Sequence, residues 1–251
     1  MDLKISEKIA LVSGSSRGLG LSIAQTLHAE GCHVIINGRD VSSLKKQASI
    51  LGERDTIIQG DVTDTTTCKQ MLAEIESSFS RLDILVCNVG SGTSVPPGEE
   101  TPDEWRRVID LNLTSATNMV ETSRHLLSKQ GGSVVCISSI CGQEVLGAPL
   151  TYSVAKAALN SYVRGIARPL ALENIRINAV APGNLLYEGS VWEQKLAEDA
   201  SAVQAMLNRE VALRRLGKSE EIADFVAFLV SPRSAFSTGA VFIVDGGQVR
   251  S

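Results

Sequence analysis

The chain has 251 residues, 43% of them hydrophobic and 21% charged, which is typical of a soluble protein with a sizeable core. A fold of this length buries roughly three quarters of the surface of its unfolded chain, so neither disulfides nor a structural metal are needed for stability. The net charge of −4 and the aromatic content of 4% exclude the basic surface and stacking platform of nucleic-acid binders. We therefore expect no nucleic-acid partner.

The cysteines and histidines do not form a recognisable metal or disulfide pattern. There are five Cys, an odd number without a C-x-x-C pair, and three scattered His. Residues 1–7 are polar, and no run of about 18 apolar residues exists that could cross a membrane. We expect no metal, no membrane attachment and a reduced, cytoplasmic location.

Short apolar runs alternate with segments of helical periodicity along the whole chain. Residues 9–13 are typical of a strand buried on both faces, a helical segment closes at Gly31, and a second strand follows at 34–36. Helices are then expected near 41–51 and 65–79, and strands at 56–59, 84–86, 134–137, 175–180 and 241–244. This alternation predicts one α/β domain over residues 1–251, a doubly wound parallel sheet of seven strands with helices on both faces.

A glycine-rich loop joins the first strand to the first helix. Gly14, Gly18 and Gly20 allow a tight turn there, and the backbone N–H groups and the helix N-terminus that follow can hold a pyrophosphate. A tight turn without a ligand is the alternative. Two further loops, 91–100 and the stretch after Pro182-Gly183, follow strand carboxyl ends, where such sheets bind ligands.

Further landmarks follow the glycine loop in a fixed order. They are Asp61-Val62, Cys87-Asn88-Val89-Gly90, Asn112, Ser139, Tyr152, Lys156, Pro182-Gly183 and Asp245-Gly246-Gly247. With them the sequence from Lys8 to Gly247 resembles the short-chain dehydrogenase/reductase family. The resemblance implies a nicotinamide-dependent oxidoreductase with a single Rossmann-type domain, assembled as a homodimer or homotetramer.

Charge after the second strand indicates which nicotinamide is used. No carboxylate stands at position 38 to bind a ribose 2′-OH, whereas Arg39 is adjacent and Arg17 lies in the glycine loop. Two guanidinium groups suit a 2′-phosphate, so we predict NADP(H). Asp40 either opposes that phosphate or caps the next helix.

The resemblance completes the set of cofactor residues. It implies that the Asp61 side chain and the Val62 backbone hold the adenine. The full set is Gly14, Ser16, Arg17, Gly18, Leu19, Gly20, Arg39, Asp61, Val62, Asn88, Gly90, Tyr152, Lys156, Pro182 and Gly183.

Tyr152 and Lys156 are four residues apart on a helical segment and project from one face. The pKa of a phenol must be lowered toward neutral pH before the phenol can exchange a proton readily. A nearby ammonium lowers this pKa because it favours the phenolate. Tyr152 is therefore the predicted acid/base, and the resemblance gives Lys156 a second bond to the nicotinamide ribose. Tyr162 on the same helix is interpreted as packing.

The resemblance implies two more catalytic residues. Ser139 would bond the substrate carbonyl oxygen, and Asn112 would steady a water in a proton relay with Lys156. The predicted reaction transfers a hydride between the nicotinamide and a carbonyl carbon, with the proton from Tyr152 and no metal.

Three positions depart from the family's pattern. Cys87 replaces an asparagine, Tyr187 stands where a threonine would bind the carboxamide, and Pro169 is expected to kink the active-site helix or end it early. We expect the effect of Cys87 to be local.

The sequence defines the reaction more closely than the substrate. Residues 216–223 and the C-terminal strand resemble the 3-oxoacyl-[acyl-carrier-protein] reductase branch, which favours a 3-oxoacyl thioester. Gln130 and Glu173 occupy positions where arginines for an acidic carrier protein are expected, although Lys129 and Arg176 lie nearby. A small ketone, sugar or polyol is the alternative substrate, and a catalytically silent NADP-binding regulator is the alternative of another class.

The segment at about 184–216 is the expected substrate lid. Its apolar residues recur at helical spacing among charges, which predicts one or two amphipathic helices over the cleft. Trp192 either contacts substrate or packs within this segment, and the same apolar faces could serve a subunit interface.

Overall fold

The computed structural model describes residues 1–52 and 55–250. Seven strands form one sheet in the order β3-β2-β1-β4-β5-β6-β9, and every pairing is parallel. They are β1 Ile9–Val12, β2 His33–Gly38, β3 Thr56–Gln59, β4 Ile84–Cys87, β5 Gly132–Ile137, β6 Ile175–Pro182 and β9 Val241–Val244. The predicted seven-stranded parallel sheet is confirmed.

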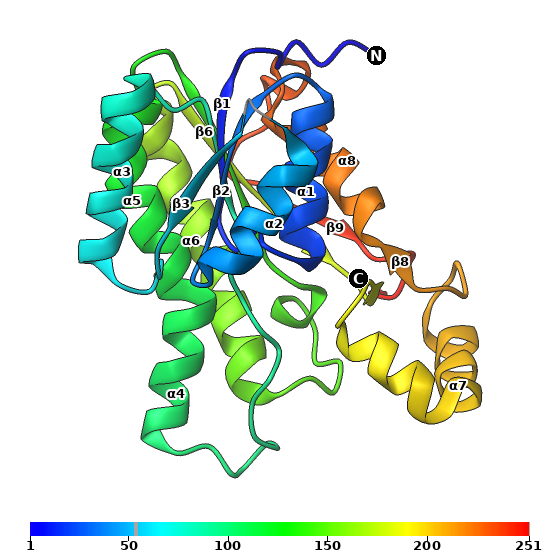
Figure 1. Ribbon diagram of the computed structural model, residues 1–251. Helices are drawn as coiled ribbons and strands as arrows, with labels where there is room; N and C mark the ends of the chain where they lie inside the picture. The colour runs from blue at the N-terminus through cyan, green and yellow to red at the C-terminus, as the bar shows by residue number, and fades with distance from the viewer. Residues whose placement is uncertain (53–54, 251) are drawn as a thin grey trace.

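Helices cover both faces of the sheet (Figure 1). One face packs against α1 Gly18–Ala29, α2 Val41–Leu51 and α8 Ser219–Val230, and the other against α3 Thr65–Phe79, α5 Ser115–Leu127 and α6 Leu150–Ala171. Each face has its own apolar core. The central strands β1 and β4 are buried at all four positions, as their continuous apolar runs predict.

Local sequence explains where several elements begin and end. The Asp40 carboxylate accepts hydrogen bonds from the backbone N–H groups of Ser42 and Ser43, so this residue caps α2. The prediction that Pro169 ends α6 early is wrong, because α6 continues through Pro169 to Ala171. Proline removes one i→i−4 hydrogen bond from this last turn, and the helix ends two residues later.

The carboxyl ends of the strands point downward in Figure 1, and the segments that follow them extend below the sheet. These include α4 Pro102–Ile109, a π-helical turn at Asp110–Thr114, a 3-10 turn at Ile140–Gly142 and α7 Val191–Glu210. A second 3-10 turn, Pro232–Ser234, follows α8.

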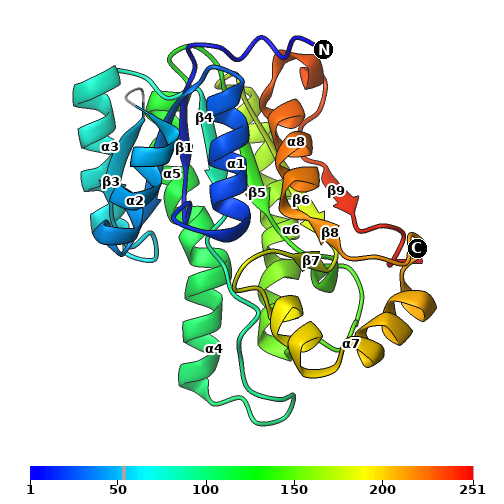
Figure 2. The same ribbon diagram turned by 45° about the vertical axis from the view of Figure 1, so that its right-hand side comes forward.

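The predicted lid is a small substructure of its own. Strand β7 Leu185–Leu186 pairs with β8 Gly217–Lys218, and α7 bends at Asp199, whose φ/ψ angles are not helical (Figure 2). Val203, Leu207 and Val211 form a separate apolar cluster with Trp192. Trp192 therefore packs within the lid, in agreement with the packing alternative. In the described part of the chain no helix has the length and apolar run to cross a bilayer.

Candidate active site

The glycine loop has the conformation that its sequence predicts. Gly14 and Gly18 have φ of 63° and 56°, values that favour glycine. Gly20 has no room for a side chain, because a Cβ there would stand 2.4 Å from the Gly14 carbonyl oxygen. Ser16 lies half-buried in the turn and Leu19 packs into the core below it. The loop thus turns onto the N-terminus of α1 with its backbone uncovered by side chains of its own.

Two asparagines hold this loop from behind. Asn88 Nδ2 donates to the carbonyl oxygens of Ser13 and Gly14, at 3.1 Å each. Buried Asn37 accepts from the Gly14 N–H through Oδ1 and donates to Ile58 O through Nδ2. Asn88, predicted to bind cofactor, has its amide committed to the loop. The sequence reasoning missed Asn37, although a polar residue within a buried apolar strand could have signalled it.

The two predicted phosphate ligands differ in how freely they are presented. Arg17 is exposed, and its side chain forms no hydrogen bond or ion pair within residues 1–52 and 55–250. Arg39 lies 3.8 Å from the Asp61 carboxylate, with both side chains largely in water. Bonds from Ser43 and Ser42 lower the pKa of Asp40 to about 2, so its charge serves the cap of α2.

The segment predicted to hold the adenine, which begins at Asp61, is anchored by a residue that the sequence reasoning did not identify. Asn118 Nδ2 on α5 donates to the carbonyl oxygens of Val62 and Thr63, at 3.2 and 3.0 Å. The Val62 side chain itself is buried in the core. Asp61 accepts hydrogen bonds from Thr63 through one oxygen.

The predicted acid/base pair lies at the carboxyl end of β5. Lys156 is 3% exposed, its Nζ donates to Ile137 O at 2.8 Å, and it lies 5.8 Å from the centre of the Tyr152 ring. Ser139 ends the strand, and its Oγ accepts from the Cys141 N–H. The structure therefore brings Ser139, Tyr152 and Lys156 to one place.

Burial dominates the titration of both groups in the free protein. It raises the pKa of Tyr152 to about 12, which a bond with the Ser139 hydroxyl offsets only in part. It lowers the pKa of Lys156 to about 8. The expected depression of the phenol pKa by the ammonium does not occur in the free protein, and the phenol holds its proton at neutral pH, as an acid in carbonyl reduction must.

Asn112 reaches Lys156 across a glycine. Its Oδ1 accepts from the Ser91 N–H at 3.0 Å and its Nδ2 donates to Ser91 O and Val108 O. A Cβ at Gly90 would stand 2.8 Å from Asn112 Oδ1 and 3.0 Å from Lys156 Nζ. Gly90 therefore leaves the space in which the amide oxygen and the ammonium face each other, and the π-helical turn places Asn112 there.

Tyr187 lies on the glycine loop. Its ring carbon Cε2 would be 2.8 Å from a Cβ at Gly18, so the ring covers this glycine. Of the other departures, Cys87 is buried and continues the core of β4. Pro182 ends β6, and Gly183 packs against the backbone of Asp245.

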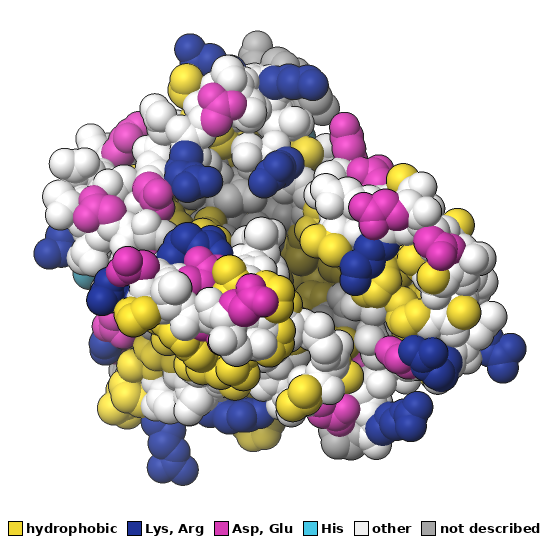
Figure 3. All heavy atoms as spheres, turned by 90° about the horizontal axis from the view of Figure 1, so that it is seen from below, with side chains coloured by type: hydrophobic (Ala, Val, Ile, Leu, Met, Phe, Trp, Pro, Cys, Tyr) yellow, Lys and Arg dark blue, Asp and Glu magenta, His cyan; other side chains and the backbone are white. Residues whose placement is uncertain are grey.

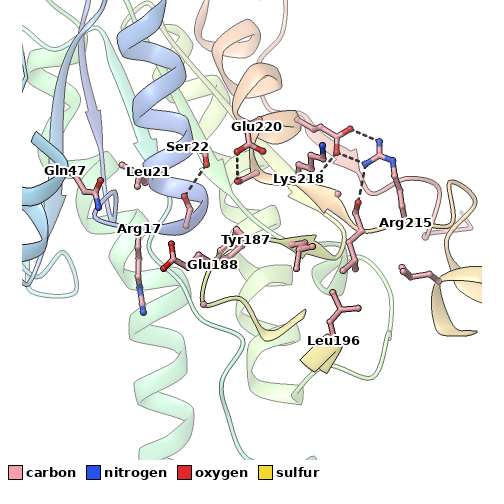
Figure 4. Close-up of a pocket in the computed structure, with 18 of the residues that line it drawn as sticks. Arg17, Leu21, Ser22, Gln47, Tyr187, Glu188, Leu196, Arg215, Lys218 and Glu220 are labelled. Carbon is pink, nitrogen blue, oxygen red and sulfur yellow. Dashed lines mark hydrogen bonds and ion pairs between the residues drawn. The ribbon is translucent and has the colours of Figure 1, made fainter. Parts of the chain in front are cut away.

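A groove of about 1220 Å³ opens beside this loop, between the N-terminal turn of α1, the lid and the segment 214–221. Figure 4 shows Tyr187 and Glu188 at its centre, with Leu196 of the lid and the paired Arg215 on the far side. Helix α7 thus stands away from the glycine loop, whereas Tyr187, which precedes this helix, lies on the loop.

The positions where arginines for a carrier protein were expected lie far from the cleft of the same subunit. Gln130 and Glu173 directly precede β5 and β6, at the edge of the sheet opposite the catalytic residues. Glu173 is paired with Arg124. Lys129 binds Glu76 at 2.8 Å, and Arg176 donates to backbone carbonyls including Leu229 O. Both cations are thus engaged in contacts within the chain.

Comparisons with known proteins agree with this geometry. A family model described as enoyl-(acyl carrier protein) reductase matches residues 14–248. The 3-oxoacyl-[acyl-carrier-protein] reductase FabG of Escherichia coli is 33% identical over 96% of this chain and 97% of its own, and nodulation protein G of Azospirillum brasilense is 32% identical over 97% and 98%. The chain belongs to the short-chain dehydrogenase/reductase family. As a member it is an oxidoreductase of carbonyl and alcohol groups.

A solved structure extends the likeness to the whole fold. L-sorbose reductase from Gluconobacter frateurii, in complex with NADPH and L-sorbose, superimposes with a TM-score of 0.94 at 30% identity and covers 100% of both chains. The expected Rossmann-type family fold is confirmed. No cluster of three His, Cys, Asp or Glu placed to hold a metal occurs within residues 1–52 and 55–250.

Proposed function

We propose that this protein reduces a carbonyl group, or oxidises the corresponding secondary alcohol, with NADP(H) as cofactor. The observation that carries the proposal is the grouping of Lys156 Nζ and Asn112 Oδ1 around Gly90, with the centre of the Tyr152 ring 5.8 Å from Lys156 Nζ. The residues present fit a dinucleotide, since the glycine loop turns with positive φ at positions 14 and 18 onto a helix N-terminus, and the Tyr187 ring lies over Gly18.

The choice of NADP(H) rests on charge at the adenosine end. Arg17 has no partner within the described chain, Arg39 has only a long exposed ion pair, and the Asp40 carboxylate is bonded to its own helix. A 2′-phosphate would find two guanidinium groups, and at Arg39 it would compete with the Asp61 carboxylate 3.8 Å away. L-Sorbose reductase, similar over its full length, was solved with NADPH. A kcat/KM tenfold higher with NADH than with NADPH would contradict this choice.

In the proposed mechanism the nicotinamide supplies or accepts the hydride when bound. Tyr152 donates its phenolic proton to the carbonyl oxygen, and the Ser139 hydroxyl bonds the same oxygen as charge develops there. Lys156 would hold the nicotinamide ribose by a hydrogen bond, and its ammonium, which borders the same space at Gly90 as Asn112 Oδ1, would pass a proton toward Tyr152. We propose Asn112, Ser139, Tyr152 and Lys156 as the catalytic residues.

The Tyr152→Phe variant tests the assignment. Loss of the hydroxyl proposed to donate this proton is expected to abolish turnover, while the NADPH dissociation constant, followed by fluorescence, changes less than threefold. Tyr162→Phe is the matched control, because the Tyr162 hydroxyl bonds Glu121 on the surface. Substantial activity in Tyr152→Phe would refute the mechanism, and NADPH binding without turnover of any carbonyl by the wild type would favour a silent regulator.

We propose a 3-oxoacyl thioester as the first candidate substrate. Apolar side chains are exposed at the segments that follow β5 and β6, namely Val145, Leu150, Leu186 and Val191. Figure 3 looks onto this edge of the sheet and shows hydrophobic side chains beside its central hollow. An acyl chain suits such a border better than a polyol does, and FabG, 33% identical, is named for this substrate class.

A ketose or polyol is the second candidate, favoured by the full-length likeness to L-sorbose reductase. A panel of acetoacetyl thioesters, small ketones and L-sorbose, assayed by NADPH consumption, separates the two. Turnover of sugars alone would exclude the thioester. The same thioester offered free and on an acyl-carrier protein tests whether the protein carrier matters. Lys129 is paired with Glu76, and Arg176 donates to backbone carbonyls. Because neither cation is presented freely to an acidic carrier protein, these contacts support a free substrate.

The remaining organisation is also proposed. The segment 184–216 acts as the substrate lid of a single domain, because its apolar cluster is separate from the two cores that pack on the sheet. We propose a homodimer or homotetramer in the reduced cytoplasm. Four of the five cysteines are buried as free thiols, which suits a reducing environment.

A further inference from the structure

Four side chains form a continuous chain of hydrogen bonds that the proposed mechanism does not use. Arg107 of α4 binds the Glu104 carboxylate through two nitrogens, at 2.8 and 2.6 Å, and also donates to Thr93 O. Ser94 Oγ lies 2.7 Å from Glu104 Oε1 and 2.7 Å from Thr151 Oγ1. The chain therefore links α4, the loop 91–100 and the first turn of α6.

The direction of each proton follows from the chemistry of the groups. Arg107, followed by Ser94, lowers the pKa of Glu104 to about 2, so the carboxylate is ionised and only accepts. The single proton of Ser94 must then go to Glu104. Thr151 consequently donates to Ser94, so the direction of both hydroxyl protons is defined.

The position of Thr151 makes this chain relevant to catalysis. Thr151 is fully buried and directly precedes Tyr152 in the first turn of α6. That helix has Pro149 as its N-cap residue, which provides no side-chain cap. An uncapped first turn frays easily because its N–H groups lack internal partners. Ser153 Oγ donates to Pro149 O within this turn, whereas the bond from Thr151 to Ser94 ties the turn to the loop 91–100.

Resting on the proposed function, we infer that Ser94, Thr151 and Glu104 are positioning residues that fix the Tyr152 backbone and the loop 91–100 as one unit. The loop follows β4 at the edge of the sheet that carries the site. A substrate that orders this loop thereby also fixes the turn that carries the acid. None of the three side chains needs to touch a reacting atom for this role.

The matched pair Thr151→Val and Thr151→Ser tests the inference. Valine keeps the shape and removes the hydroxyl, whereas serine keeps the hydroxyl and loses a methyl group. We would measure kcat and KM with an N-acetylcysteamine acetoacetyl thioester or L-sorbose, whichever the wild type reduces. The NADPH dissociation constant and hydrogen exchange by mass spectrometry would be followed in parallel.

The expected results separate positioning from general damage. Thr151→Val should lower kcat about tenfold, the effect of losing one hydrogen bond that acts in the transition state, with the NADPH dissociation constant within twofold. Exchange should accelerate in residues 91–100 and 150–156 alone. Thr151→Ser should restore kcat to within twofold of the wild type. Ser94→Ala, at a half-buried position, should reproduce the valine result if that variant does not fold.

Two outcomes would overturn the inference, and a third would overturn the function instead. Unchanged kcat and hydrogen exchange in Thr151→Val would show that the Thr151–Ser94 hydrogen bond does not position Tyr152. An equal loss of kcat in Thr151→Ser would show that packing alone matters. A wild type that neither binds NADPH nor reduces a carbonyl would refute the proposed function. Hydrogen exchange would still decide whether the tie orders the turn.

Discussion

Replacing Lys156 by methionine should make the protein more stable at neutral pH and inactive. The ammonium is buried and donates to Ile137 O, and burial lowers its pKa from 10.5 to about 8. Because a tenfold change in proton affinity corresponds to about 1.4 kcal/mol, keeping this group charged costs the fold about 3 kcal/mol at pH 7. Methionine has a similar unbranched shape and no charge to bury.

The sign and the pH range of this effect follow from the lowered pKa. Below pH 8 both the folded and the unfolded chain hold the proton, so the full cost is present. Between pH 8 and 10.5 the folded chain has released the proton and the unfolded chain has not, so the wild type gains stability as the pH rises. Loss of the donor to Ile137 O costs the variant about 1 kcal/mol. The net gain is therefore about 2 kcal/mol at pH 7 and vanishes near pH 10.

Urea unfolding of both proteins at pH 7 and pH 10 measures this difference, and thermal unfolding at pH 7 should show a Tm higher by roughly 4–8 °C. Lys129→Met is the matched control. Lys129 is 40% exposed and paired with Glu76, so its loss should change stability by less than about 0.5 kcal/mol. A Lys156→Met variant that is less stable at pH 7, or whose advantage persists at pH 10, would refute the burial argument.

Three further predictions concern the cofactor cleft. Gly90→Ala places a methyl group 3.0 Å from Lys156 Nζ and should lower kcat at least about tenfold in steady-state kinetics. The control Gly165→Ala, in open space on α6, should leave kcat unchanged. Tyr187→Ala removes the ring that covers Gly18 and should tighten NADPH binding about threefold in a fluorescence titration. The control Val191→Ala, at the exposed start of α7, should leave binding unchanged. Weaker binding in Tyr187→Ala would show that the ring supports the cofactor instead. Because raising the pH through about 8 removes the Lys156 proton while Tyr152 keeps its own, kcat/KM for NADPH should fall above pH 8, and a profile flat to pH 9.5 would contradict this.

Much of the fold could be predicted because its signals are local. The run Ile84-Leu85-Val86 is apolar on both faces, and that pattern alone requires a central strand with helices above and below. Gly14 and Gly18 likewise predict positive φ angles in the turn that follows β1, and both angles are positive. Such features depend on neighbours in the sequence, which a single chain displays.

The parts that were not predicted depend on contacts between distant residues. Ser94 and Thr151 are 57 positions apart, and nothing near either residue indicates that their hydroxyls meet. The pKa of Tyr152 depends above all on how deeply the folded chain buries its hydroxyl, and the sequence does not display that burial. The bend at Asp199 and the two-residue ladder of β7 and β8 are equally invisible to periodicity, because both are too short to show a pattern.

The position of Trp192 gives the lid an optical reporter of its own. The indole lies in the lid's apolar cluster, with the Lys195 ammonium 4.6 Å from the ring centre, and the other tryptophan, Trp105, belongs to α4. Emission from an indole responds to a nearby charge and can transfer its energy to a reduced nicotinamide. In a Trp105→Phe background, the movement of residues 184–216 could therefore be timed in a stopped-flow instrument without attaching a dye.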